Sequence, residues 1–263
     1  MMNKKNLFIL LFCINCIPGY CDNGAFVSYF ADYSLSKRIG IHFDGNGRFL
    51  SSFIGSSYFM TLRLGINYTL NPKQENALIQ VSAGYALKQS YFGNVQQSDS
   101  IGNIIGEYNF IQTNHIIWQQ VQIKHTFGRQ FKLYNRLRTE QDFKFNNALA
   151  KTAYMKSFEG YSMTRLRYMI RPEIYLLKEE KTISPYISIQ EELFIKLHSS
   201  NPLDKLIQEN RISFNIGLSF KKATQIEIGY MNNAFIQNAI SNQINFIQLQ
   251  VIQNLNFYKS KNN

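Results

Sequence analysis

The chain has 263 residues, of which 45% are hydrophobic, and its 28 Lys and Arg against 17 Asp and Glu give a formal net charge of +11 at pH 7. After residue 21 no apolar run approaches the roughly 20 residues that a membrane-spanning helix requires. Cys13, Cys16 and Cys21 all stand in the first 21 residues, which excludes disulfide scaffolds, thiol nucleophiles and thiolate metal sites from the rest of the chain.

The first predicted element is a secretory leader over residues 1–21. It has a basic start at Lys4 and Lys5, an apolar run over residues 7–17 and a helix-breaking Pro-Gly pair. Together these features predict a signal peptide that is cleaved near Cys21-Asp22. Lipidation is disfavoured because the cysteines of the leader do not follow small residues.

Residues 22–263 are predicted to form one domain of β-strands, since no linker rich in Pro, Gly or Ser divides them. Side chains alternate between the two faces of a strand, and here apolar residues occupy one face of nearly every segment while polar residues occupy the other. In chain order the segments cover about 25–35, 38–49, 60–68, 79–87, 117–127, 131–138, 166–176, 187–195, 211–221, 225–230 and 247–257. In an exported chain this pattern predicts a transmembrane, antiparallel, up-and-down β-barrel, because lipid offers no partner for the backbone of an open sheet.

The number of strands is predicted from the parity of known barrels. About eleven segments can be counted, but single-chain bacterial barrels have even numbers of strands. We therefore expect twelve strands, with ten as the alternative: either residues 101–111 hide a further strand, or the N-terminal segment does not complete a crossing.

The predicted connections alternate in length. Short joins near 70–76, 127–131, 177–183 and 221–224 alternate with longer ones near 89–112, 145–160, 198–208 and 233–243. Short periplasmic turns and long outer loops would produce this rhythm, and the last strand would then end in the periplasm.

Charged residues recur on the polar face of the predicted strands. Ten of them form a predicted charge ladder in the barrel lumen: Arg136, Arg138, Glu140, Arg165, Arg167, Arg171, Glu173, Glu192, Arg211 and Glu227. In a narrow lumen these charges would lose water and must pair, so we expect a ladder that braces the interior. The alternative is a water-filled pore whose arginines favour anions.

Several short motifs, in a fixed order, resemble those of a known family. They are Gly84-Tyr85, Trp118-Gln119-Gln120, the segments 136–141 and 165–168, Glu192-Leu193-Phe194, Asn210-Arg211 and the segment 227–231. The series, which covers roughly Tyr58 to Phe257, resembles the bacterial outer-membrane barrel family catalogued as domain of unknown function 2490 (DUF2490). The resemblance implies a barrel and no established activity.

One motif offers a catalytic candidate. The segment His198-Ser199-Ser200-Asn201 is similar to the catalytic stretch of outer-membrane phospholipase A and lipid A deacylase, in which a His activates a Ser nucleophile. Those enzymes have Gly after the Asn, whereas Pro202 stands here. We therefore lean away from an enzyme, with a lipid hydrolase that uses His198 and Ser200 as the alternative.

Metal and cofactor sites are not expected. His42, His115 and His125 do not stand at metal-ligand spacing from one another or from paired carboxylates. The segment Asp44-Gly45-Asn46-Gly47 is interpreted as a turn rather than as a calcium loop, because the remaining calcium ligands are missing.

The sequence thus predicts a monomeric protein of the bacterial cell outer membrane, either a structural barrel or a small passive channel with a charged lumen. Without the leader the charge is about +9, which suits contact with outer-membrane lipid and lipopolysaccharide, although a generally basic chain without a special partner fits equally well. The barrel-assembly machinery would be a partner during insertion, and no nucleic acid is expected. A third possibility is an adhesin, which would depend on the loops 89–112 and 145–160.

Overall fold

The structure is a computed structural model, and it describes residues 21–52, 55–74, 76–98, 104–150, 153–177, 182–199, 206–221, 223–237 and 240–258. Apart from Cys21, the predicted signal peptide lies outside these residues. Every regular element in them is a strand: β1 (Cys21–Ser34), β2 (Ile39–Ser52), β3 (Gly55–Thr69), β4 (Ala77–Ser98), β5 (Ile104–Phe127), β6 (Phe131–Ala150), β7 (Ala153–Tyr175), β8 (Ile183–Ser199), β9 (Ile207–Phe220), β10 (Thr224–Gln237) and β11 (Ile240–Asn256). No helix in this part of the chain is long and apolar enough to cross a membrane.

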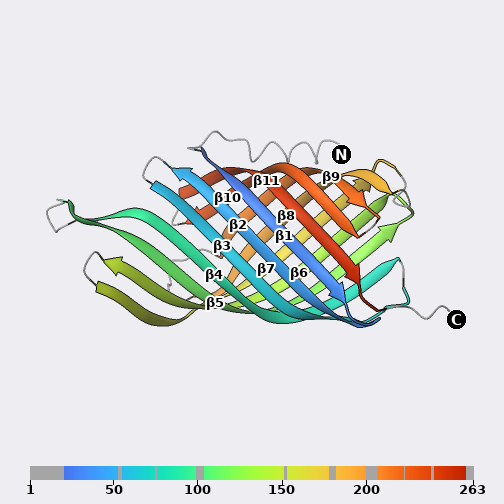
Figure 1. Ribbon diagram of the computed structural model, residues 1–263, viewed down its shortest axis with the longest axis horizontal. Coiled ribbons are helices and arrows are strands. Elements are labelled where there is room, and N and C mark those ends of the chain that lie inside the picture. Colours follow the sequence, from blue (N-terminus) through green and yellow to red (C-terminus); the bar gives the residue numbers. More distant parts are fainter. Residues whose placement is uncertain are drawn as a thin grey trace, which may run out of the picture.

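The strands form one closed barrel in chain order, with β1 placed beside β11 (Figure 1). Every pair of consecutive strands is antiparallel, whereas β1 and β11 run parallel, with Ala25 opposite Ile247 and Tyr33 opposite Leu255. A backbone hydrogen bond of 3.0 Å from the N–H of Phe257 to the carbonyl of Ser34 continues this parallel pair beyond the end of β11.

The prediction of twelve strands is wrong, because the described residues form eleven. Residues 104–111 are the first part of β5 and make no strand of their own, and β1 pairs along its length with both β2 and β11. An odd number of strands in up-and-down order leaves the first and last strands pointing the same way. The predicted antiparallel arrangement therefore fails at the β1–β11 pair.

The predicted long loops near 89–112, 145–160 and 233–243 are also wrong, because most of their residues belong to strands. Most of the predicted loop near 198–208 lies outside the described residues. The segments 89–98 and 104–112 continue β4 and β5, and the segments 145–150 and 153–160 continue β6 and β7. Figure 1 shows these two hairpins projecting beyond the rest of the barrel. We call this end, where β2–β3, β4–β5, β6–β7, β8–β9 and β10–β11 are joined, the hairpin end; the opposite end, where β11 finishes, is the turn end.

The two faces of the barrel wall differ as the alternation predicts. On β9 the outward Ile216 is 56% exposed, whereas the neighbouring Asn215 is buried. Large apolar side chains also stand exposed on other strands, including Ile66 at 67% and Ile247 at 70%. The interior is therefore polar and the outer surface apolar, the reverse of a water-soluble barrel.

Trp118 is the largest side chain buried in the interior, and two glycines make room for it. A Cβ atom on Gly65 would lie 2.5 Å from the Trp118 ring, and one on Gly84 would lie 2.8 Å from it. The ring packs edge-on to His42 at 5.5 Å, and the Arg138 guanidinium lies 5.2 Å from its centroid. Trp118 therefore forms an apolar wall against which the charged interior is built.

Candidate functional site

The interior of the barrel is crossed by ion pairs between strands that are not neighbours. Arg63 on β3 lies 3.3 Å from Glu140 on β6, and Arg48 on β2 lies 3.3 Å from Glu209 on β9. These strands are not hydrogen-bonded to one another in the closed sheet. Their side chains can therefore meet only across the interior of the barrel. We call the charged groups around Glu140 and their direct partners the central cluster: Asp44, Arg48, Arg63, Arg136, Arg138, Glu140, Arg165, Arg167, Glu192, Glu209 and Arg211.

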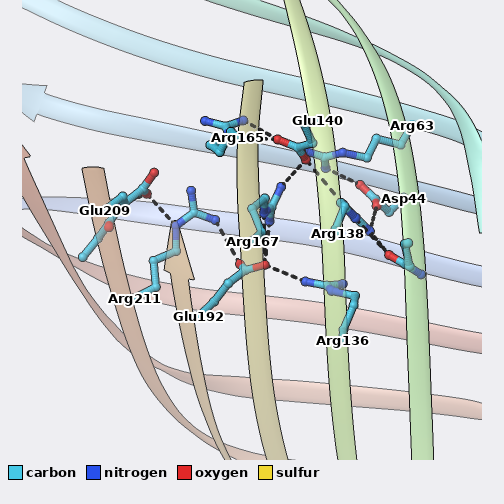
Figure 2. A network of polar contacts seen from close by, with 12 residues as sticks. Asp44, Arg63, Arg136, Arg138, Glu140, Arg165, Arg167, Glu192, Glu209 and Arg211 are labelled. Atoms are coloured by element: carbon cyan, nitrogen blue, oxygen red, sulfur yellow. Dashed lines mark hydrogen bonds and ion pairs between the residues drawn. The ribbon is translucent and has the colours of Figure 1, made fainter. Parts of the chain in front are cut away.

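Glu140 is the centre of this cluster and is fully buried (Figure 2). Its carboxylate lies 2.7 Å from Arg167, 3.3 Å from Arg63 and 3.9 Å from Arg138, and it also accepts hydrogen bonds from Arg165. Four guanidiniums from β3, β6 and β7 thus share one carboxylate. A buried carboxylate is tolerated only when charged donors replace its lost water, which these arginines do.

Glu192 and Glu209 extend the cluster toward β8 and β9. Glu192 lies 2.7 Å from Arg136, 2.8 Å from Arg167 and 3.6 Å from Arg211. Arg211 also donates from Nε to Glu209 at 2.6 Å. Because Arg167 bonds to both Glu140 and Glu192, it connects the two halves of the cluster (Figure 2).

Asp44 joins the opposite side of the cluster, which corrects the interpretation of Asp44-Gly45-Asn46-Gly47 as a turn. The segment lies in the middle of β2, and the fully buried Asp44 lies 2.7 Å from Arg63 and 3.4 Å from Arg138. The Oδ2 atom that faces Arg138 also lies 3.3 Å from Nε2 of His42. The two glycines suggested a turn, but they stand on the outward face of a regular strand.

A second group of charges lies nearer the turn end. Arg171 pairs with Glu173 at 2.9 Å and also with Glu227. The hydroxyl of Tyr186 donates to Glu227 at 2.6 Å, and the Tyr186 ring stacks on Tyr175 with centroids 5.0 Å apart. We call these five residues the turn-end cluster.

All ten residues of the predicted charge ladder lie inside the barrel. The structure brings seven of them into the central cluster and three, Arg171, Glu173 and Glu227, into the turn-end cluster. Sequence reasoning missed Asp44, Arg48, Arg63 and Glu209 as members. The alternation rule could have found Arg63, which stands between the outward Leu62 and Leu64, whereas Glu209 stood between the predicted loop near 198–208 and the predicted strand 211–221.

Two cavities, each of about 140 Å³, lie along the interior. The turn-end cavity reaches Asp32 and Asn254, and the hairpin-end cavity reaches Leu50 and Phe235. Four side chains line both: Asn46, Arg63, Arg167 and Arg211. The central cluster therefore stands between the two cavities.

The catalytic candidates are only partly described. His198 lies near the hairpin end of β8, exposed, and its ring stacks on that of Tyr161 with centroids 5.7 Å apart. Ser200 lies outside the described residues, so the lipid-hydrolase alternative stays a prediction. Among the described residues no group of three or more His, Cys, Asp or Glu could hold a metal ion.

Comparison with known families identifies the family of the chain. A family model described as "Protein of unknown function (DUF2490)" matches residues 23–245. No curated protein matches the chain. The matched range extends the predicted resemblance, which began near Tyr58, back through β2 and into β1.

Proposed function

Since the chain belongs to the DUF2490 family, whose function is unknown, we propose that it is an outer-membrane β-barrel whose interior is braced and closed by buried ion pairs. The observation that carries this proposal is the position of Glu140. This fully buried carboxylate holds arginines from three strands in the middle of the interior. The barrel would thus be a structural element of the membrane rather than an open pore.

The outer surface supports the placement in a membrane. Large apolar side chains such as Ile66, Ile228 and Ile247 are at least 60% exposed, which water would penalise and hydrocarbon would not. Tyr68 also stands exposed on this surface near the turn end of β3, where an aromatic ring suits the lipid headgroup level. In this placement the turn end faces the periplasm and the hairpin end faces the lipopolysaccharide.

The pairing of the interior charges supports a closed barrel. Arginines that line a water-filled pore keep their hydration and need no carboxylate, whereas arginines in a narrow, dry interior must be paired. Each of the four carboxylates in the central cluster contacts at least two arginines. This cluster also separates the two cavities, so that ions would have to displace it in order to pass.

The proposal is tested by the conductance of the refolded protein in a planar bilayer. We expect wild-type protein to be silent and Arg167→Ala to give discrete steps, because Arg167 lines both cavities and links Glu140 to Glu192. Lys73→Ala in the exposed β3–β4 turn is the control and should stay silent. Heat-modifiable migration on a gel verifies that each variant is folded. Discrete, anion-biased steps from wild-type protein would instead establish the passive channel.

A further inference from the structure

The hairpin-end cavity is strongly basic. Among the residues that the structure describes, six cationic side chains line it and one carboxylate, that of Glu209, does so. The six are Arg48, Arg63, Lys88, Arg165, Arg167 and Arg211. Such an imbalance inside a closed wall creates a strong positive potential, because a low-dielectric surrounding screens charge weakly.

The ion pairs of the interior do not neutralise this charge. The central cluster and Lys88 together contain eight cationic groups, and the four carboxylates of the cluster pair with its seven arginines. Adding the buried Asp142, which accepts a hydrogen bond of 2.6 Å from Asn114, still leaves three cations in excess within this group of residues. Uncompensated charge away from water is costly, so an anion that entered the cavity would be stabilised.

Two donors on the wall of the cavity are available to such an anion. Lys88 takes part in none of the ion pairs found among the described residues, although it lies on the inward face of β4. The Nε of Arg63 is buried and has no hydrogen-bond partner within the described structure. An oxygen atom of a bound anion would satisfy either donor with a charge-assisted hydrogen bond.

One part of the wall is apolar. Phe246 is buried and packs with Phe26, with Leu50 and Ile244 against them, and Phe235 also lines the cavity. Inorganic ions gain nothing from such a surface, whereas a hydrocarbon chain is stabilised by leaving water for it.

Phe194 holds the basic side of the cavity in place. Its buried ring lies under the guanidiniums of Arg211, Arg167 and Arg165, at 4.2, 4.5 and 5.4 Å from its centroid. Stacking of this kind fixes planar guanidiniums without consuming their N–H groups. The cationic wall is therefore ordered before any ligand arrives.

We propose that the hairpin-end cavity binds an anionic amphiphile, with its phosphate or carboxylate head group at Lys88, Arg63 and Arg165 and its short apolar chain against Leu50, Phe235 and Phe246. The proposal goes beyond the closed barrel, because a barrel braced by ion pairs requires no ligand. It assigns to this chain an interior binding site on the hairpin-end side of the central cluster.

Calorimetric titration of the refolded protein in nanodiscs of zwitterionic lipid tests this site. The probes are hexyl phosphate, hexanoate, hexanol and inorganic phosphate. We expect saturable binding of hexyl phosphate or hexanoate, at least tenfold tighter than that of inorganic phosphate and of hexanol. The comparison of the two anionic amphiphiles identifies the preferred head group.

Variants separate this site from non-specific attraction by a basic protein. Lys88→Met and Lys88→Gln should each weaken amphiphile binding at least tenfold, while Lys73→Met in the exposed β3–β4 turn should leave it unchanged. Phe235→Ala should weaken binding of hexyl phosphate but not that of inorganic phosphate. Lack of binding by folded wild-type protein, or wild-type affinity in either folded Lys88 variant, would overturn the proposal. This titration does not depend on conductance. A lack of binding would therefore contradict the binding site without contradicting the closed barrel.

Discussion

Glu140 contacts more oppositely charged groups than any of its partners does. Its four arginine contacts come from β3, β6 and β7, so its charge joins β3 to β6 and β7, two strands with which β3 shares no backbone hydrogen bonds. A buried ion pair adds little when compared with an apolar pair of the same shape, but the loss of one partner leaves the other charged and without water. Stability should therefore be sensitive to the removal of this one charge.

We predict that Glu140→Gln lowers the free energy of unfolding by about 3–5 kcal/mol, the usual cost of removing one partner from a buried pair. Urea unfolding followed by the fluorescence of the single tryptophan, the buried Trp118, measures the change. The matched control is Glu191→Gln, at an exposed position of β8, which should leave stability unchanged or slightly higher. Equal effects of the two substitutions would show that the central cluster does not brace the barrel.

The sequence identifies inward residues well and their partners poorly. Alternation alone placed Arg138 and Glu140 on the polar face, because it reports only the parity of a position within a strand. It could not show that Glu140 meets Arg63, since that contact depends on barrel closure and on the register of the intervening strands. Asp44 was missed for a local reason, namely that flanking glycines favour turns.

At the scale of elements, the predicted strands were located but not their ends. The segment 89–98 contains Gly93-Asn94, which favours turns, yet it pairs with β5 up to Ser98 opposite Ile104. Pairing with a neighbouring strand supplies hydrogen bonds whatever the intrinsic preference of the residues, so tertiary context outweighs local propensity here. The sequence does not reveal that β1 and β11 pair in parallel. The alternation of outward apolar residues is the same in a parallel pair as in an antiparallel pair.

The β1–β11 pair can be tested by cross-linking. Val27 lies opposite Leu249, both on the outer surface, and Cα atoms of adjacent strands are about 4.8 Å apart, within the range for a disulfide. We predict that Val27→Cys with Leu249→Cys forms a disulfide on oxidation, which is read out as a shift in the migration of the unfolded chain.

The control for this cross-link pairs Val27→Cys with Val251→Cys. Val251 stands opposite Tyr29, so its Cα lies about 8 Å from that of Val27, too far for a disulfide. A twelve-strand barrel would insert another strand at this seam and would leave both cysteine pairs reduced. No cysteine occurs after Cys21, so that the engineered pairs are the only thiols downstream of it.

At the scale of the whole molecule, the odd strand number places the two ends of the sheet at opposite ends of the barrel. The first residues of β1 lie at the hairpin end and the last residues of β11 at the turn end, as the directions of the two arrows in Figure 1 show. In a barrel with an even number of strands both would lie at the same end. The class of fold could be predicted from composition and alternation. The barrel ends at which β1 starts and β11 finishes could not, because they depend on whether the number of strands is odd or even.

We predict that epitope tags at the two termini report opposite sides of the membrane. A tag inserted after Asp22 should bind antibody on intact cells, because β1 starts at the hairpin end, whereas a tag after Asn263 should bind only after the outer membrane is permeabilised. Permeabilised cells, in which both tags should be detected, serve as the control for expression. Tags that become accessible together would contradict the eleven-strand topology or its orientation.

The parallel seam also sets an order of folding. β1 can pair with its neighbour β2 across a short turn, but its other edge needs β11, the last strand that the structure describes. Closing so large a loop is entropically costly and slow, and until it is closed both β1 and the growing end of the sheet expose unpaired backbone. A chain that is truncated before β11 would keep two open edges, so that the pairing of β1 with β11 is the step that removes the last aggregation-prone edges of the sheet.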